Sequence, residues 1–190
     1  SDGKTTGDSP GLSASAPDDL AFEVRWNDSR DQVEISAGCQ LLTTLRLDQQ
    51  RPCLFPLYSP GGSMVLRRWP IEEAIEGESK DHPHHAGAWI AHGSVAGHDF
   101  WHGKGTRQVP SEWESYLLDD DHILIVSGKL SWVAGDNRIL EETRTYDFRV
   151  IEDAYRIEIW SLWKPAGDQG VKIGDTKEGT FALRLAPTMR

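Results

Sequence analysis

The chain has 190 residues, the length of one ordinary domain, and its 38% hydrophobic and 26% charged residues are typical of a folded globular protein and exclude a fibrous or wholly disordered chain. Its formal net charge of -10 repels polyphosphates, and no cluster of Lys and Arg reverses that sign locally, so we expect no nucleic-acid partner. No apolar run approaches the roughly 18 residues that a transmembrane helix needs, which excludes a membrane span of that kind.

The first 19 residues differ in composition from the rest of the chain. Ser1 to Asp19 is rich in Ser, Gly, Asp, Thr and Pro and lacks apolar periodicity, which predicts a disordered tail. Such a tail often follows a removed export signal, although no signal peptide is present. We therefore divide the chain into a tail over 1–19 and one β domain over 20–190, and we expect an extracytoplasmic location.

Short segments of alternating apolar and polar residues follow the tail and predict β-strands. They are Phe22–Trp26, Val33–Ser36, Leu41–Leu47 and Cys53–Tyr58. Pro52 and Pro56 place the last of these at a sheet edge or rim, because proline cannot donate to a strand ladder.

The clearest pattern lies between Ile123 and Trp163. Ile123–Val133 and Arg138–Val150 flank the turn Gly135–Asn137, and Tyr155–Trp163 follows, which predicts a meander of long antiparallel strands with one buried face. No segment has a convincing helical period; Ile71–Lys80 is the best candidate, and it is short and acidic. The fold class is therefore all-β, a large antiparallel two-sheet β-sandwich of the supersandwich type.

The carboxyl end predicts the start of another strand over Gly179–Ala186, and no closing element follows it. We expect an unpaired, incomplete edge there, and a native continuation beyond it. Cys39 and Cys53 are the only cysteines, so the chain forms either one bridge or two separately buried thiols.

Six of the seven histidines fall within 21 consecutive positions, interleaved with Trp89, Asp99 and Trp101. They are His82, His84, His85, His92, His98 and His102. Imidazoles at this density permit proton transfer near neutral pH or ligation of a divalent metal, and both chemistries need a nearby carboxylate. Asp81 and Asp99 are local candidates for it, and Glu178 is the best distant one.

Other residue types offer binding groups. Trp101 could present a flat apolar platform to a sugar ring, although most of the eight tryptophans should be core. Arg67, Arg68 and Arg184 are either solvated charges at a sheet edge or ligand clamps. No serine-nucleophile elbow, phosphate loop or dinucleotide fingerprint is present.

Four segments resemble a family named PmoA-like, or methane oxygenase PmoA. They are Phe55–Gly62, Asp81–Gly93, Asp99–Trp101 and Gly174–Gly179, and the resemblance runs in order from about Phe22 to the end. It implies an exported bacterial protein from a carbohydrate-degrading context, with a galactose mutarotase-like sandwich whose late strands this chain lacks. It does not imply methane oxidation here, because the membrane-bound enzyme of that name is helical, whereas this chain is β-rich.

Mutarotase-like sites join histidines from an early loop with a glutamate from a late strand. The resemblance thus implies catalytic roles for His85, His92 and Glu178. We expect His82, His84, Trp101, Lys177 and Arg68 to bind a small-molecule or glycan ligand.

Two alternatives remain open from the sequence. One is a non-catalytic carbohydrate-binding module that uses the same histidines. The other is a metal-dependent oxygenase or hydrolase that holds a divalent metal through His82, His84, His92 and a carboxylate.

Overall fold

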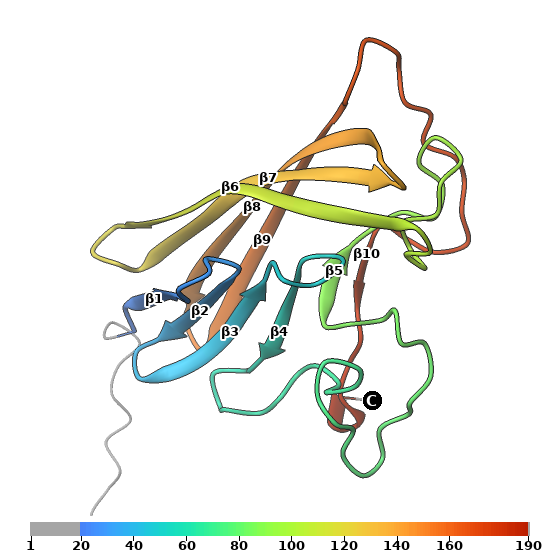
Figure 1. Cartoon of the computed structure of the whole chain (residues 1–190). Coiled ribbons are helices and arrows are strands. Elements are labelled where there is room, and N and C mark those ends of the chain that lie inside the picture. Colours follow the sequence, from blue (N-terminus) through green and yellow to red (C-terminus); the bar gives the residue numbers. More distant parts are fainter. Residues whose placement is uncertain (1–19, 190) are drawn as a thin grey trace, which may run out of the picture.

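The computed structural model describes residues 20–189, and the tail predicted over 1–19 lies outside the described residues. The described chain forms two antiparallel sheets, of six and four strands, and a single 3-10 turn of helix at Pro187–Met189. Figure 1 shows the four-stranded sheet lying across the six-stranded one. The predicted all-β, two-sheet sandwich is confirmed.

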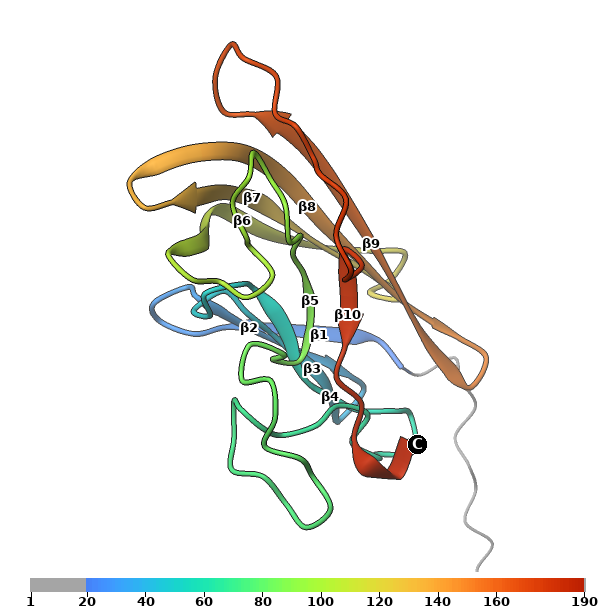
Figure 2. The ribbon, with the colours of Figure 1, turned by 90° about the vertical axis from the view of Figure 1, so that its right-hand side faces the viewer.

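The first sheet has the strand order β1-β2-β3-β4-β5-β10, so the last strand joins the sheet beside β5. Its strands are β1 (Phe22–Trp26), β2 (Gln32–Ala37), β3 (Gln40–Arg46), β4 (Cys53–Leu57), β5 (Ala88–Ile90) and β10 (Phe181–Leu183). Figure 2 shows β5 and β10 side by side at one edge of this sheet.

The second sheet is a meander of long strands in the order β6-β7-β8-β9. Its strands are β6 (Thr106–Leu118), β7 (Ile123–Ala134), β8 (Asn137–Ile151) and β9 (Ala154–Pro165). The predicted turn is confirmed, since Gly135, with a φ of 58°, and Asp136 connect β7 to β8. A left-handed φ costs glycine nothing, because it has no Cβ to clash with the backbone.

The core lies between the sheets. On β8, Tyr146 and Phe148 are 1% and 0% exposed, which follows from the period of two that sends alternate side chains to the same face. The same face carries a buried ion pair, Arg144 with Glu142, whose side chains are both 0% exposed. The sandwich therefore encloses a polar network between its two sheets.

Two local features differ from the expectations, and the lack of a helix agrees with them. The β4 strand lies between β3 and β5 and not at an edge. It tolerates Pro56 there because β5 pairs only with Cys53 and Leu54, so no partner on that side needs the missing N–H of Pro56. The segment Ile71–Lys80 forms turns and bends and no helix. Strands β5 and β6 were not predicted: β5 has only three residues, and polar side chains interrupt the alternation along β6.

The remaining general features concern cysteines and membrane crossing. Both thiols are free, with Cys39 exposed and Cys53 buried, so the structure contains no bridge between them. In residues 20–189 no helix has the length and apolar character needed to cross a membrane.

Candidate functional site

The antiparallel pairing of β5 with β10 brings two distant loops together. Ala88, the first residue of β5, pairs with Leu183, the last residue of β10. Consequently Arg184, which follows β10, donates its backbone N–H to the carbonyl of Gly87, which precedes β5 (3.1 Å). Arg67 in turn donates its backbone N–H to the Arg184 carbonyl (2.8 Å).

Four imidazoles gather at this end of the β5–β10 pair. We call His82, His84, His85 and His102 the histidine cluster. The ring centroid of His84 lies 4.3 Å from that of His85 and 4.7 Å from that of His102, and the ring of His82 stacks on that of His85 with 4.9 Å between centroids. Three of the rings come from the loop before β5 and the fourth comes from the loop after it, so the fold assembles the cluster.

A buried arginine holds these two loops in place. The Arg51 guanidinium, in a residue only 8% exposed, donates to the His84 carbonyl (2.6 Å) and to the carbonyls of Phe100 (3.3 Å) and Trp101. Hydrogen bonds from a charged donor are stronger than neutral ones. Arg51 therefore fixes the backbone from which the histidines project.

Tryptophans form the floor of the cluster. His85 lies 5.2 Å from the ring of Trp89 and 5.8 Å from that of Trp101, and the two indole rings are 5.3 Å apart. Trp101 is 5% exposed and Trp89 is 2% exposed, so His85 packs against two buried indoles. The ring of Trp101, expected to bind a sugar, supports the histidines in this structure and is not itself open to a ligand.

Two of the histidines are each paired with a carboxylate. His82 Nδ1 donates to Asp81 Oδ2 (2.7 Å), and His102 Nδ1 donates to Asp99 Oδ2 (2.6 Å). No described residue hydrogen-bonds to the Nε2 atom of either ring. A carboxylate at Nδ1 holds the proton there and leaves the Nε2 lone pair available as a base or ligand.

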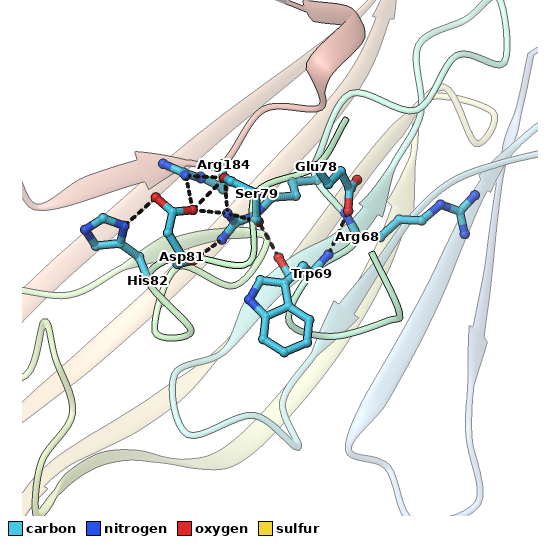
Figure 3. Close-up of polar contacts among 8 residues, drawn as sticks. Arg68, Trp69, Glu78, Ser79, Asp81, His82 and Arg184 are labelled. Carbon is cyan, nitrogen blue, oxygen red and sulfur yellow. Dashed lines mark hydrogen bonds and ion pairs between the residues drawn. The ribbon is translucent and has the colours of Figure 1, made fainter. Parts of the chain in front are cut away.

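Asp81 is also the centre of a wider polar network, drawn in Figure 3. Its Oδ1 atom accepts from Arg67 Nη1 (2.7 Å), from Arg184 Nη2 (2.6 Å) and from the Ser79 hydroxyl (2.6 Å). These hydrogen bonds, from Ser79 and His82 first and then from the two arginines, hold the pKa of the Asp81 carboxyl far below its usual range. Asp81 is therefore ionised at any physiological pH.

The two central histidines are kept uncharged. Burial, followed by the nearby His84 and His82 and then by Arg184 and Arg67, lowers the pKa of His85 to about 4. Burial and the proximity of His102 and Arg51 also lower the pKa of His84. A buried imidazole beside positive groups resists protonation, so at neutral pH His85 can accept a hydrogen bond.

His92 and Glu178, two of the expected catalytic residues, lie away from the cluster. His92 follows β5 and so lies at the opposite end of the β5–β10 pair from His85. Its Nε2 donates to the Gly174 carbonyl (2.9 Å), and its Nδ1 accepts from the Thr180 hydroxyl (3.3 Å). The Glu178 carboxylate accepts from Thr176 (3.2 Å). Both of these groups are thus engaged with the 174–180 segment.

The other expected binding residues are also separate. Lys177 is exposed on the same 174–180 segment. Arg68 forms an ion pair with Glu72 (2.7 Å), and Figure 3 shows its guanidinium pointing away from Asp81. Of the arginines considered from the sequence, it is Arg67 and Arg184 that reach the cluster.

The expected metal ligands do not converge. His82 and His84 are neighbours, with rings 5.7 Å apart, but His92 is at the other end of β5. Within residues 20–189 no three His, Cys, Asp or Glu side chains are grouped so that they could hold a metal ion.

The histidine cluster is a surface site. The side chains of His82 and His102 are 54% and 45% exposed. A hollow of about 440 Å³ lies elsewhere, on the four-stranded sheet, and is lined by residues such as Lys129, Glu141 and Leu162. A ligand at the histidine cluster would therefore remain partly open to water.

Sequence reasoning found the histidines and their local carboxylates, and it missed the arginine that holds the two loops together. Asp81 beside His82 and Asp99 three residues before His102 were visible as local carboxylates, and they are the partners that the structure shows. Arg51 carried no signal, because its role depends on a loop that is 33 residues away in the chain.

Comparison with known proteins gives one match. A family model described as a family of unknown function, DUF6807, matches residues 32–190. This finding corrects the expected membership in the PmoA-like, or methane oxygenase, family, for which the comparison gives no support. No curated protein and no solved structure matches the chain.

Proposed function

Since the chain belongs to the DUF6807 family, whose function is unknown, we propose that the histidine cluster binds a saccharide and transfers protons on its hydroxyl or anomeric groups. The observation that carries this proposal is the presence of two carboxylate-oriented imidazoles, His82 and His102, in one cluster. In each ring a carboxylate accepts from Nδ1, and no described residue hydrogen-bonds to Nε2.

The chemistry follows from the state of each ring. An imidazole whose Nδ1–H is held by a carboxylate accepts a proton at Nε2 and is stabilised as it becomes positive. His82 and His102 can thus act as general bases, and they return the proton as acids. His85, uncharged at neutral pH, offers an acceptor to a second hydroxyl. Sugar hydroxyls both donate and accept, so they match such a mixed surface.

In this proposal the acid–base groups differ from those expected from the sequence. The carboxylates of Asp81 and Asp99 replace Glu178, because they contact the imidazoles directly. His92 stays outside the reaction, since both of its ring nitrogens are engaged.

A second candidate function is saccharide binding without catalysis. The openness of the cluster favours it, because His82 and His102 are about half exposed and enzymes generally exclude water from reacting groups. The same residues would then only hold the ligand.

The test begins with calorimetric titration of the full chain against neutral mono- and oligosaccharides. For each ligand that binds, proton NMR then follows the interconversion of anomers and the exchange of carbon-bound hydrogens. We expect His102→Gln to lower the catalysed rate about 10²-fold or more while changing affinity far less. His98→Gln is the matched control, because His98 is exposed and outside the cluster.

The outcomes separate the two candidates. A rate that falls in His102→Gln and in Asp99→Asn supports acid–base chemistry. Binding that depends on the cluster, without any catalysed change in the sugar, supports the binding module. If no saccharide binds, the proposal is overturned.

A further inference from the structure

Asp81 is outnumbered by the arginines that it contacts. Its carboxylate carries one negative charge and accepts from two guanidinium groups, Arg67 and Arg184. The Asp81 carboxylate alone therefore does not balance both guanidinium groups at the edge of the histidine cluster. An uncompensated cation near a site attracts an anion.

Of the two arginines, Arg184 is the one with N–H donors that make no hydrogen bond to the described residues. Every nitrogen of the Arg67 guanidinium is used, because it donates to the carbonyls of Trp69, Ser79 and Asp81 and to the Asp81 carboxylate. Arg184 uses only Nη2 in the described residues, and its Nε is buried without a hydrogen-bond partner. Its side chain is 23% exposed and Nη1 is not among the buried atoms, so a ligand can reach Nη1.

The surroundings of Arg184 add positive potential to a protein of net charge -10. Arg184 and Arg67 are the permanently charged groups that act on His85, and both disfavour a further positive charge there. This local field is opposite in sign to the chain as a whole.

The acidic residue nearest to this network on the other side is already engaged. Glu78 accepts from the backbone N–H groups of Arg68 (2.8 Å) and Trp69 (3.3 Å). Figure 3 shows Glu78 at the end of the network away from His82. The charge of Glu78 acts on Arg67, and no ion pair joins Glu78 to Arg184 among the described residues.

We infer that Arg184 recognises an anionic substituent on the saccharide, a carboxylate as in a uronic acid, beside the imidazoles of His82 and His85. The inference rests on the proposed function, since it assigns the class of sugar that the histidine cluster takes. A guanidinium donates charged N–H groups to a carboxylate, and Arg184 Nη1 makes no hydrogen bond to a described residue, so it is the nitrogen that would donate to the ligand. A sulfate ester shares this oxyanion chemistry.

The test compares matched sugars on the full chain by calorimetric titration: galactose with galacturonate, glucose with glucuronate, their short oligomers, and a sulfated analogue of each. We expect the uronates to bind at least about tenfold more tightly than the neutral sugars. The advantage should shrink as salt is raised from low to high concentration, whereas neutral binding should not change.

The substitution Arg184→Gln should remove the preference for uronates and leave the affinity for neutral sugars. Arg184→Lys, which keeps the charge and replaces the guanidinium, should retain part of it. Arg68→Gln is the control, because this neighbouring arginine pairs with Glu72 instead. If Arg184→Gln does not fold, the salt dependence of the unmodified protein still decides the matter.

Each result has one meaning. Equal affinity for uronates and neutral sugars overturns this inference and leaves the proposed function standing. A uronate preference that survives in Arg184→Gln, or a stronger preference for sulfated sugars, also overturns it. If no saccharide of either kind binds, the proposed function falls together with the inference.

Discussion

The buried ion pair between Glu142 and Arg144 should be worth far more than the ion pair next to it on the same strand. Glu142 accepts from Arg144 Nε (2.6 Å) and Nη2 (2.8 Å), from Trp132 Nε1 (2.7 Å) and from the Ser161 hydroxyl (2.6 Å). Arg144→Met leaves that carboxylate buried and short of a charge partner, which costs about 3–5 kcal/mol. Glu142→Leu should cost a similar amount, since it strands the guanidinium.

The double substitution should cost much less than the two single ones together. It removes both charges and leaves neutral groups unpaired, chiefly the Trp132 N–H, at about 1–3 kcal/mol each. We therefore expect a coupling energy of about 3 kcal/mol or more between Glu142 and Arg144. The assay is urea unfolding followed by tryptophan fluorescence, with the denaturant dependence checked for constancy.

A control on the opposite face of β8 makes this prediction sharp. Arg138 pairs with Glu141 (2.9 Å) where both side chains are at least half exposed, so Arg138→Met should cost at most about 1 kcal/mol. If Arg144→Met costs no more than this control, water reaches the pair and the two sheets do not enclose it. That result would refute the reasoning.

Three further predictions concern the loops and the thiols. Gly87→Ala should lower the free energy of unfolding in urea by about 3 kcal/mol, because its φ is +68° and a Cβ would lie 2.5 Å from the Leu54 carbonyl oxygen. Gly97→Ala, with a φ of +79° and nothing near its Cβ, should lower it by about 1 kcal/mol, and equal costs would contradict the close approach of Gly87 to Leu54. A thiol reagent should modify exposed Cys39 in the native protein and Cys53 only after denaturation, since burial raises the pKa of Cys53 to about 12. Rapid reaction of two thiols per chain in the native protein would refute this. The pKa of His85 is lowered from 6.5 to about 4, so the unfolded chain binds more protons between those pH values, and the free energy of unfolding should fall by about 1 kcal/mol as pH drops through them, after allowance for solvent screening. His85→Gln should flatten that fall, and a pH profile of stability that the substitution leaves unchanged would argue against the lowered pKa.

The comparison between sequence and structure differs for local and distant features. The strands Phe22–Trp26 and Ile123–Ala134 were predictable because a sandwich strand buries alternate side chains, so its apolar residues recur at every second position of the sequence. The density of histidines and the adjacent Asp81 and Asp99 were visible for the same reason. Each of these features depends on residues only a few positions apart.

What the sequence could not supply is the partner of each short strand. β5 has three residues and no pattern, and its position is set by pairing with Cys53 on one side and with β10 on the other. That pairing sends His85 to one end of the strand and His92 to the other, which a count of histidines treats as equivalent. It also brings Arg184 beside Asp81, which is 103 residues away in the chain.

The sequence by itself thus determined the fold class, the long meander and the residue types that crowd around the future site, because hydrophobic period, turn glycines and local spacing act over a few residues. Only the tertiary structure decided which histidines form a cluster, which carboxylates orient them and which arginine faces them. Those contacts arise when the antiparallel pairing of β5 and β10 and the buried guanidinium of Arg51 bring separate loops to one place.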